Sequence, residues 1–229
     1  MLVKNWMSKG VMAIGVDDSL YQAIELQKKY DIHILPVIKK EKMGIAGIVT
    51  DRDIKRASVP DGIPLDIHEA VYLTSKIKVK SIMTFPVITV PLDNTLQETA
   101  EILTKNDISG VPVVDDKGQV AGIITQRDIL RALLSVITMD NKGYQFAFKV
   151  KDRLGAVSND LVKVIHDHGG RIASIVTSYK KAPVGYRYAY IQVYSLAPEK
   201  LPQLIEEFKK KASLLYIVDS IQDKKEFYG

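Results

Sequence analysis

The 229-residue sequence contains no cysteine. This absence excludes disulfide bonds, thiolate metal sites and cysteine nucleophiles, and it is compatible with a reducing compartment. The chain also lacks an apolar run long enough to span a membrane, and its N-terminus lacks the hydrophobic region of a signal peptide. We therefore expect a cytoplasmic protein without a membrane partner, long enough to form one or two domains with real cores.

Familiar catalytic motifs are missing as well. The sequence contains no Gly-x-Ser-x-Gly motif, no Walker loop and no Rossmann fingerprint. His166-Asp167-His168 resembles a metal site by composition, but residues two apart on a helix point to different faces, and histidine near a helix C-terminus is favoured by the dipole. We therefore predict a protein with no catalytic residue, no metal ion and no cofactor. An enzyme of an unrecognised type stays open as an alternative.

What the sequence does contain is an internal repeat, a feature to be sought before any other. Gly47–Ile54 returns 75 positions later as Gly122–Ile129, and 9 of the 13 aligned positions around this segment are identical. Upstream the repeat continues with an offset of 76 positions, which aligns Met7 with Met83. The chain therefore begins with two copies of one structural unit.

The residue pattern of each copy predicts an α/β unit. It opens with an apolar stretch and a run at helical spacing, continues with two short β-rich runs, and ends in a second helix that starts directly after a threonine. The apolar stretches are Val11–Val16 and Val87–Leu92, and the predicted strands are Ile34–Ile38, Ile45–Val49, Val111–Val114 and Val120–Ile124. Short strands that alternate with helices indicate a β-α-β-β-α unit with some parallel pairing.

Both copies share the pattern Gly-h-h-Thr-x-Arg-Asp, in which h is apolar. One interpretation is a helix start, where Thr50 caps the helix and Asp53 completes a capping box. A second interpretation adds a ligand, because a helix N-terminus favours phosphate and a carboxylate in the first turn can accept from two vicinal hydroxyls. Arg52 and its counterpart Arg127 favour this second interpretation, since a helix start does not require them.

The first 138 residues resemble a tandem CBS (cystathionine-β-synthase-type) module, also called a Bateman module. Three features carry the resemblance: this pattern, the apolar-Pro-apolar-apolar strand before it, and the spacing of the repeat. The resemblance gives CBS repeat 1 at 1–58, an inter-repeat linker or helix at 59–78 and CBS repeat 2 at 79–138. It implies that adenosine-containing regulatory ligands (AMP, ADP, ATP or S-adenosylmethionine) bind in two clefts between the repeats. One repeat would supply threonine and aspartate, and the other its first strand and the backbone before its proline.

The resemblance assigns a set of residues to each cleft. Cleft one would use Thr50, Arg52, Asp53, Thr89, Ser109, Gly110, Val111 and Pro112. Cleft two would use Ala13, Ile14, His33, Ile34, Leu35, Pro36, Thr125, Arg127 and Asp128. Because Thr89 offers a hydroxyl where its counterpart is Ala13, we expect cleft one to be better equipped. His33, opposite Ser109, either closes or tunes cleft two or is an ordinary surface residue.

After a linker at 139–143 the pattern changes. Strands are predicted at Tyr144–Lys151, Arg171–Tyr179, Tyr186–Tyr194 and Leu214–Val218, and helices at Ala156–His168 and Pro198–Lys211. The order β-α-β-β-α-β is that of the ferredoxin-like fold. With Asp152-Arg153-Leu154-Gly155 between the first strand and helix, residues 144–221 resemble an ACT domain, followed by a C-terminal tail at 222–229. The resemblance implies that a small effector, usually an amino acid, binds at Asp152, Leu154, Gly155, Ala156 and Val157; an ordinary helix-entry turn is the alternative.

The order CBS–CBS–ACT resembles the acetoin-utilisation accessory proteins of bacteria. Such modules usually regulate an enzyme or channel, so we predict a stand-alone regulatory sensor with a protein partner. We also expect a homodimer or larger assembly, because exposed sheet edges are usually paired.

The alternative class is a nucleic-acid-associated regulator that uses the basic C-terminal half. Residues 142–229 carry 15 basic and 9 acidic residues, whereas the whole chain has a net charge of +5. The lysine clusters Lys209–Lys211 and Lys224-Lys225 are not accompanied by interleaved aromatic residues or a known binding motif. We therefore do not expect nucleic acid as a partner from the sequence.

Overall fold

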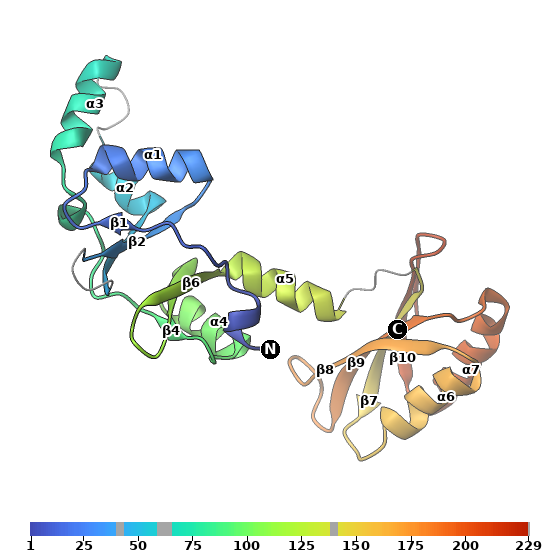
Figure 1. The fold of residues 1–229 in the computed structure, drawn as a ribbon. Helices are drawn as coiled ribbons and strands as arrows, with labels where there is room; N and C mark the ends of the chain where they lie inside the picture. The colour runs from blue at the N-terminus through green and yellow to red at the C-terminus, as the bar shows by residue number, and fades with distance from the viewer. Residues whose placement is uncertain (40–43, 59–65, 138–141, 229) are drawn as a thin grey trace. The chain divides into compact units, whose positions relative to one another are not determined.

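The computed structural model describes residues 1–39, 44–58, 66–137 and 142–228 (Figure 1). Contacts divide the chain into two compact units, Met1–Arg131 and Ala132–Gly229. Of the segments expected from the sequence, residues 139–141 of the linker and the first part of the inter-repeat segment, 59–65, lie outside the described residues.

In the first unit each sequence repeat forms a three-stranded sheet, in the orders β1-β2-β3 and β4-β5-β6. In both sheets the first strand is parallel to the second, and the second is antiparallel to the third. The elements are η1 (Val3–Asn5), β1 (Ile14–Gly15), α1 (Leu20–Tyr30), β2 (Ile34–Ile38), β3 (Ile45–Thr50), α2 (Asp51–Ala57), α3 (Ile67–Lys76), η2 (Val79–Ser81), β4 (Val90–Pro91), α4 (Leu96–Lys105), β5 (Gly110–Val114), β6 (Val120–Thr125) and α5 (Gln126–Ile137). The boundary between the two units falls within α5, after Arg131. Strands β2, β3, β5 and β6 lie within one residue of their predicted bounds.

The first strand of each repeat is much shorter than the apolar stretch that contains it. In the first repeat the Asp18 carboxylate accepts the backbone N–H of Gly15 at 2.8 Å, which turns the chain away from the sheet. In the second repeat the strand ends at Pro91, which has no N–H to donate to a neighbouring strand. The apolar stretches therefore contribute core side chains rather than long strands.

The two repeats exchange the segments that precede their first strands. Ser8, from the start of the first repeat, forms an antiparallel bridge with Ile123 in β6 of the second repeat. Thr84, from the start of the second repeat, forms the matching bridge with Ile48 in β3 of the first. The repeats are therefore interlocked, and a site between them draws on both.

This exchange explains a glycine and a methionine that both copies share. A Cβ built on Gly47 would overlap the side chain of Met83. A Cβ on Gly122 would overlap the side chain of Met7 in the same way, with its sulfur 2.5 Å away. The glycine of the repeated pattern is thus needed where the exchanged segment crosses the strand.

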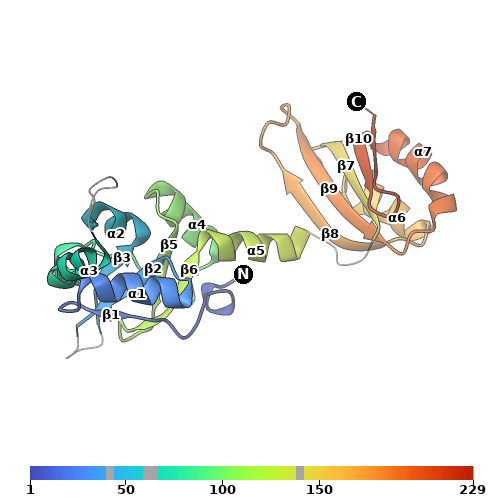
Figure 2. The same ribbon diagram turned by 90° about the horizontal axis from the view of Figure 1, so that it is seen from above.

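The second unit is a five-stranded antiparallel sheet in the order β11-β10-β7-β9-β8, and α6 and α7 lie on one of its faces (Figures 1 and 2). Its elements are β7 (Tyr144–Lys151), η3 (Ser158–Val162), α6 (Lys163–Asp167), β8 (Arg171–Ser178), β9 (Tyr186–Tyr194), η4 (Pro198–Lys200), α7 (Leu201–Lys211), β10 (Ser213–Asp219) and β11 (Lys224–Phe227). Phe148 of β7 meets Phe208 of α7 edge to face, with ring centroids 4.8 Å apart. Up to β10 the order of elements is the predicted β-α-β-β-α-β.

Two details differ from the sequence expectation. The helix expected at 156–168 begins with a π-helical turn, because the carbonyl of Gly155 accepts from the backbone N–H groups of both Asn159 and Asp160. Residues 224–227, expected in a tail, form β11 and pair with β10. The Asp219 carboxylate accepts two backbone N–H groups of the connecting turn, which brings the chain back alongside the sheet.

Candidate functional site

Helix α2 begins where β3 ends, and its first turn carries residues that both repeats share. The hydroxyl oxygen of Thr50, the N-cap residue, accepts the backbone N–H of Asp53 at 3.4 Å. The Asp53 carboxylate accepts the Thr50 backbone N–H at 2.9 Å and the Thr50 hydroxyl at 2.7 Å. The predicted capping box is confirmed. It fixes the position of a carboxylate whose residue is only 7% exposed.

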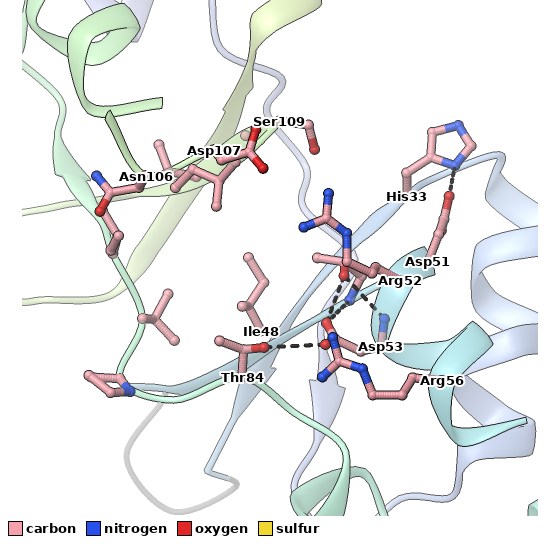
Figure 3. A pocket seen from close by; sticks show the side chains of 17 residues that line it. His33, Ile48, Asp51, Arg52, Asp53, Arg56, Thr84, Asn106, Asp107 and Ser109 are labelled. Carbon is pink, nitrogen blue, oxygen red and sulfur yellow. Dashed lines mark hydrogen bonds and ion pairs between the residues drawn. The ribbon is translucent and has the colours of Figure 1, made fainter. Parts of the chain in front are cut away.

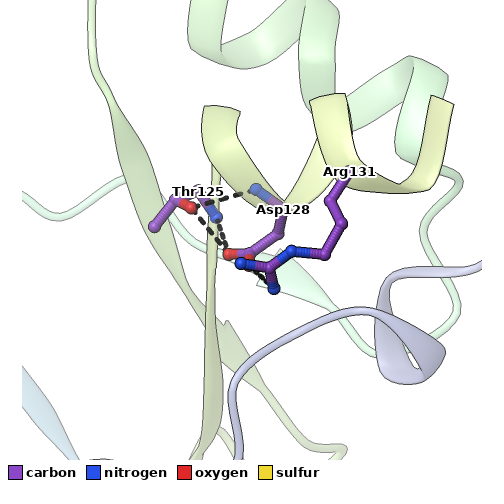
Figure 4. Close-up of polar contacts among 3 residues, drawn as sticks. All are labelled: Thr125, Asp128 and Arg131. Atoms are coloured by element: carbon purple, nitrogen blue, oxygen red, sulfur yellow. Dashed lines mark hydrogen bonds and ion pairs between the residues drawn. The ribbon is translucent and has the colours of Figure 1, made fainter. Parts of the chain in front are cut away.

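The same arrangement recurs at the start of α5, where the Asp128 carboxylate accepts the Thr125 N–H at 3.0 Å and its hydroxyl at 2.6 Å (Figure 4). The second carboxylate oxygen has a different neighbour in each repeat. At Asp128 it accepts from the Arg131 guanidinium at 3.5 Å. At Asp53 it accepts from the hydroxyl of Thr84, on the exchanged segment, at 3.3 Å.

A pocket of about 500 Å³ opens beside Asp53, between the two repeats (Figure 3). One wall comes from the first repeat, at the start of α2, and the opposite wall is residues 106–111, which lead into β5 of the second repeat. The lining residues are His33, Ile48, Thr50, Asp51, Arg52, Asp53, Arg56, Thr84, Pro86, Val87, Ile88, Asn106, Asp107, Ile108, Ser109, Gly110 and Val111.

This pocket brings together most of the residues assigned to cleft one. Those in the lining are Thr50, Arg52, Asp53, Ser109, Gly110 and Val111. Among the described residues, the lining does not include Thr89 or Pro112. The hydroxyl beside Asp53 comes instead from Thr84, which the sequence reasoning missed. The available signal was that Thr84 aligns with Ser8, so both copies place a hydroxyl residue after the shared methionine.

The pocket wall formed by α2 is rich in charge. Arg52 and Arg56 line it, and both residues are exposed. His33, which the resemblance assigned to cleft two, lines this pocket instead, with its Nδ1 2.7 Å from an Asp51 carboxylate oxygen. Figure 3 shows Asp107 on the opposite wall. The site therefore has guanidinium groups on the same helix as the capped Asp53 carboxylate.

Gly110 occupies a tight position where the repeats meet. A Cβ at this residue would lie 2.7 Å from the Ile34 side chain of the first repeat and 3.0 Å from the Ile124 carbonyl oxygen. The lack of a side chain therefore allows the start of β5 to approach the first repeat closely, and this approach forms the pocket wall.

The residues assigned to cleft two divide into a polar group and a buried group. Thr125 and Asp128 are bonded to each other as described, and Arg127 is exposed. From the first repeat, Ala13 is partly exposed, whereas Ile14, Ile34, Leu35 and Pro36 are buried. The buried four contribute their side chains to packing, so only their backbone is available to a ligand.

The five residues assigned to an effector site in the second unit differ in their contacts and exposure. The Asp152 carboxylate accepts the Tyr179 hydroxyl at 3.1 Å and lies 3.8 Å from the Arg187 guanidinium. Leu154 is fully exposed, whereas Ala156 and Val157 are buried in the core. Gly155 has φ of +77°, a conformation that favours glycine, and a Cβ there would lie 2.7 Å from the Asn159 amide nitrogen.

The described residues contain neither a cluster of metal-ligating side chains nor a membrane-spanning helix. Within that part of the chain, no group of three or more His, Cys, Asp or Glu side chains is placed to hold a metal ion. Nor does any described helix combine the length and apolar character needed to cross a bilayer.

Comparisons with known proteins agree with the repeat. Residues 3–60 and 79–135 match the CBS domain family. A CBS domain-containing protein of Dictyostelium discoideum is 31% identical over 137 residues, which cover 60% of this chain and 94% of that protein. A solved CBS domain of a CBS domain-containing membrane protein from Sphaerobacter thermophilus is 25% identical, with a TM-score of 0.51, and the match covers 57% of this chain and 86% of that chain. A solved CBS domain pair in complex with 5′-methylthioadenosine and S-adenosyl-L-methionine is 32% identical, covers 59% of this chain and 97% of that chain, and has a TM-score of 0.49.

Proposed function

Because the chain belongs to the CBS domain family, with both repeats matched, we propose that it is a regulatory sensor that binds an adenosine-containing ligand beside Asp53. The observation that carries the proposal is the Asp53 carboxylate. It is held by the Thr50 cap in the wall of a pocket whose opposite wall comes from the other repeat. The volume of about 500 Å³ lies within the range of small-molecule sites.

The ribose is the part of the ligand that Asp53 would hold. A carboxylate can accept hydrogen bonds from two vicinal hydroxyls, as an acidic residue does in dinucleotide-binding folds. The Thr84 hydroxyl that now donates to Asp53 at 3.3 Å is at the long end of hydrogen-bond distances. A ribose hydroxyl would therefore replace a weak contact with a stronger one.

The remaining lining supports the other parts of a nucleotide. Val87, Ile88 and Val111 provide apolar surface against which a purine ring can pack. Arg52 and Arg56 provide guanidinium groups for phosphate, a pairing with charge-assisted hydrogen bonds. We therefore propose AMP, ADP or ATP ahead of S-adenosylmethionine at this pocket, since S-adenosylmethionine brings a positive sulfonium instead of phosphate.

The proposal extends to the second unit, to the protein partner and to the cellular location. The second unit would be an ACT-type module that binds an amino acid or another small metabolite, and the chain would act on a protein partner in the cytoplasm without catalysing a reaction. The order of domains supports the resemblance to acetoin-utilisation accessory proteins.

We expect a homodimer or larger assembly, so light scattering at micromolar concentration should give at least twice the chain mass of 25.6 kDa. A clean monomer would contradict the assembly and any effector site shared between chains.

A thermal-shift panel tests the ligand proposal. AMP, ADP, ATP, S-adenosylmethionine and the amino acids are added separately to the full chain. At about 100 times its dissociation constant, a ligand of the native state adds about 2.7 kcal/mol to the free energy of unfolding. This corresponds to a rise of several degrees in the melting temperature. If no adenosine compound at millimolar concentration raises the midpoint, the sensor function loses its main support.

A further inference from the structure

The sheet of the second unit has one face that α6 and α7 cover and one face that they leave open (Figure 2). At one end of the open face the Gln192 amide donates to the carbonyl of Ile137, the last residue of α5, at 3.2 Å. Along β7, the side chains of Tyr144, Phe146, Phe148 and Val150 belong to the core beneath these helices. Because side chains alternate along a strand, the residues between them point to the open face. The strand registers then identify the open-face positions of the neighbouring strands.

One cross-strand row on the open face is largely aromatic. Pairing places Phe227, Tyr216, Ala147, Tyr190 and Val176 in line from β11 to β8. Phe227 is 76% exposed, and its ring centroid lies 6.1 Å from that of Tyr216. Ala147 is fully buried although it is on the open face, where it lies between Tyr216 and Tyr190 in the row. Burial raises the pKa of Tyr216, and the nearby Tyr190 raises it further. The row is therefore a closely packed aromatic surface.

Positive charge flanks this aromatic row. Lys149 and Lys151 follow Ala147 on the same face of β7, and Lys225 occupies an open-face position on β11. The Lys149 amine lies 5.8 Å from the ring centroid of Tyr186, the β9 residue opposite Lys151. Across the described strands β7 to β11, the open-face positions hold no aspartate or glutamate. Lysines and tyrosines are thus interleaved in space, which the linear sequence did not reveal.

From this geometry we propose that the open face binds a single-stranded nucleic acid. Each unpaired base offers a flat face that stacks on a tyrosine ring, and the lysines meet the phosphates. The charge pattern disfavours the same face of a second copy, since stacking two such faces would bring lysines together without a carboxylate to neutralise them. A duplex is disfavoured because its base faces are already stacked within the helix.

Strand β9 carries a further feature of nucleic-acid-binding sheets. RNA-recognition sheets with four strands present aromatic residues that stack two or three bases. Tyr188-Ala189-Tyr190-Ile191 has the aromatic-small-aromatic-apolar order found within the RNP1 pattern of those sheets. The Lys/Arg-Gly pair that begins RNP1 is here Tyr186-Arg187. The resemblance is therefore to the stacking positions, and the proposal includes no base sequence.

Fluorescence anisotropy with the full chain tests the proposal. The probes are labelled oligouridine and oligothymidine of about 12 nucleotides, within the range of single-strand site sizes. Neither contains adenosine or an internal sugar with two free vicinal hydroxyls, so neither offers the ribose group that the proposed function assigns to Asp53. The open-face variants described next separate binding at this sheet from any contact at the pocket. At about 50 mM salt we expect both single strands to bind, and a mixed-sequence duplex to bind at least about tenfold more weakly. The difference between the two probes measures recognition of the 2′-hydroxyl.

Variants on the open face locate the contact. Tyr190→Leu keeps apolar bulk but removes one stacking ring, and should raise Kd by roughly 5- to 150-fold. Lys149→Gln should weaken all single strands alike and reduce the slope of log Kd against log salt by about 0.7. The matched controls are exposed residues that are not part of this face, Tyr30→Leu in α1 and Lys210→Gln in α7. Both should leave Kd unchanged, and melting midpoints verify that each variant is folded.

Three results would overturn the proposal. The first is no binding of either probe at a chain concentration of about 100 µM, the weak end of non-specific affinity. The second is Kd values for Tyr190→Leu and Lys149→Gln equal to those of their controls, which would place any contact elsewhere. The third is that Tyr190→Leu changes the mass of the assembly but leaves the Kd for single strands unchanged, because the face would then contact a second copy of the chain.

Discussion

The two repeats hold the same threonine–aspartate pair in the same geometry but surround it differently. In both, the carboxylate accepts the N–H and hydroxyl of the preceding threonine. At Asp53 the second carboxylate oxygen accepts the Thr84 hydroxyl, and the residue lines a pocket. At Asp128 the second oxygen accepts from the Arg131 guanidinium, whose side chain is 63% exposed.

The difference separates two roles of one side chain. Capping needs only the threonine three residues earlier, so both repeats have it. Ligand binding needs the second carboxylate oxygen to be available, and this depends on residues outside the cap. Arg56, which aligns with Arg131, lines the pocket in the first repeat. The same arginine position can therefore serve the ligand in one repeat and the aspartate in the other.

The largest expected effect is on ligand affinity. Asp53→Ala should weaken binding of the adenosine ligand beside α2 by at least about tenfold, because hydrogen bonds to a charged group contribute about 1.5–3 kcal/mol. Asp128→Ala should leave this affinity unchanged and weaken only a ligand in cleft two. Isothermal titration calorimetry on both variants measures the difference.

Stability provides the control for this pair. Each alanine variant loses the same capping box, so each should lower the free energy of unfolding by a similar amount, about 1 kcal/mol. Denaturant titrations measure that loss. Equal stability losses together with undiminished affinity in both variants would leave the carboxylates with a capping role alone.

The next largest effect is expected on stability, at the glycine that both repeats share, where the two repeats should respond alike. Gly47→Ala places a methyl group against Met83, and Gly122→Ala places one against Met7. Each should reduce the free energy of unfolding by about 1–2 kcal/mol through overpacking. Urea unfolding of each glycine variant, alone and combined with Met83→Ala or Met7→Ala, forms a double-mutant cycle. Additive effects would show that the exchanged segments do not press on these strands.

The smallest effects distinguish the two arginines. Arg56→Gln should weaken AMP by about three- to tenfold and adenosine hardly at all, since it removes a phosphate contact. Arg131→Gln should leave affinity beside Asp53 unaltered and tighten a ligand in cleft two by no more than about fivefold, because an exposed ion pair contributes up to about 1 kcal/mol. Competition binding with AMP and adenosine on both variants provides the comparison. Matching losses for AMP and adenosine with Arg56→Gln would rule out a phosphate contact.

Much of the fold could be predicted because it depends on local pattern. Thr50 and Asp53 stand three apart before a helix, which is sufficient for a capping box wherever the helix packs. The paired strands of each repeat follow from short apolar runs bounded by turns. By contrast, β11 contains Lys224 and Lys225 and pairs only because the turn after Asp219 returns it to β10.

The contribution of Thr84 to the pocket could not be predicted in the same way. A local pattern is identical whether the segment containing Met83 and Thr84 packs on its own repeat or on the other. The bridges Thr84–Ile48 and Ser8–Ile123 in the structure reveal the exchange. The alternation of Tyr188 and Tyr190 was visible in the sequence, but the lysines beside them come from another strand and needed the register.

The most direct test of the central claim is a crystal structure of the full chain with the adenosine compound that gives the largest thermal shift. We expect electron density for the ligand between α2 and residues 106–111, with a ribose hydroxyl within hydrogen-bond distance of the Asp53 carboxylate. Density for the ligand at another place, with Asp53 still bonded only to Thr50 and Thr84, would contradict it.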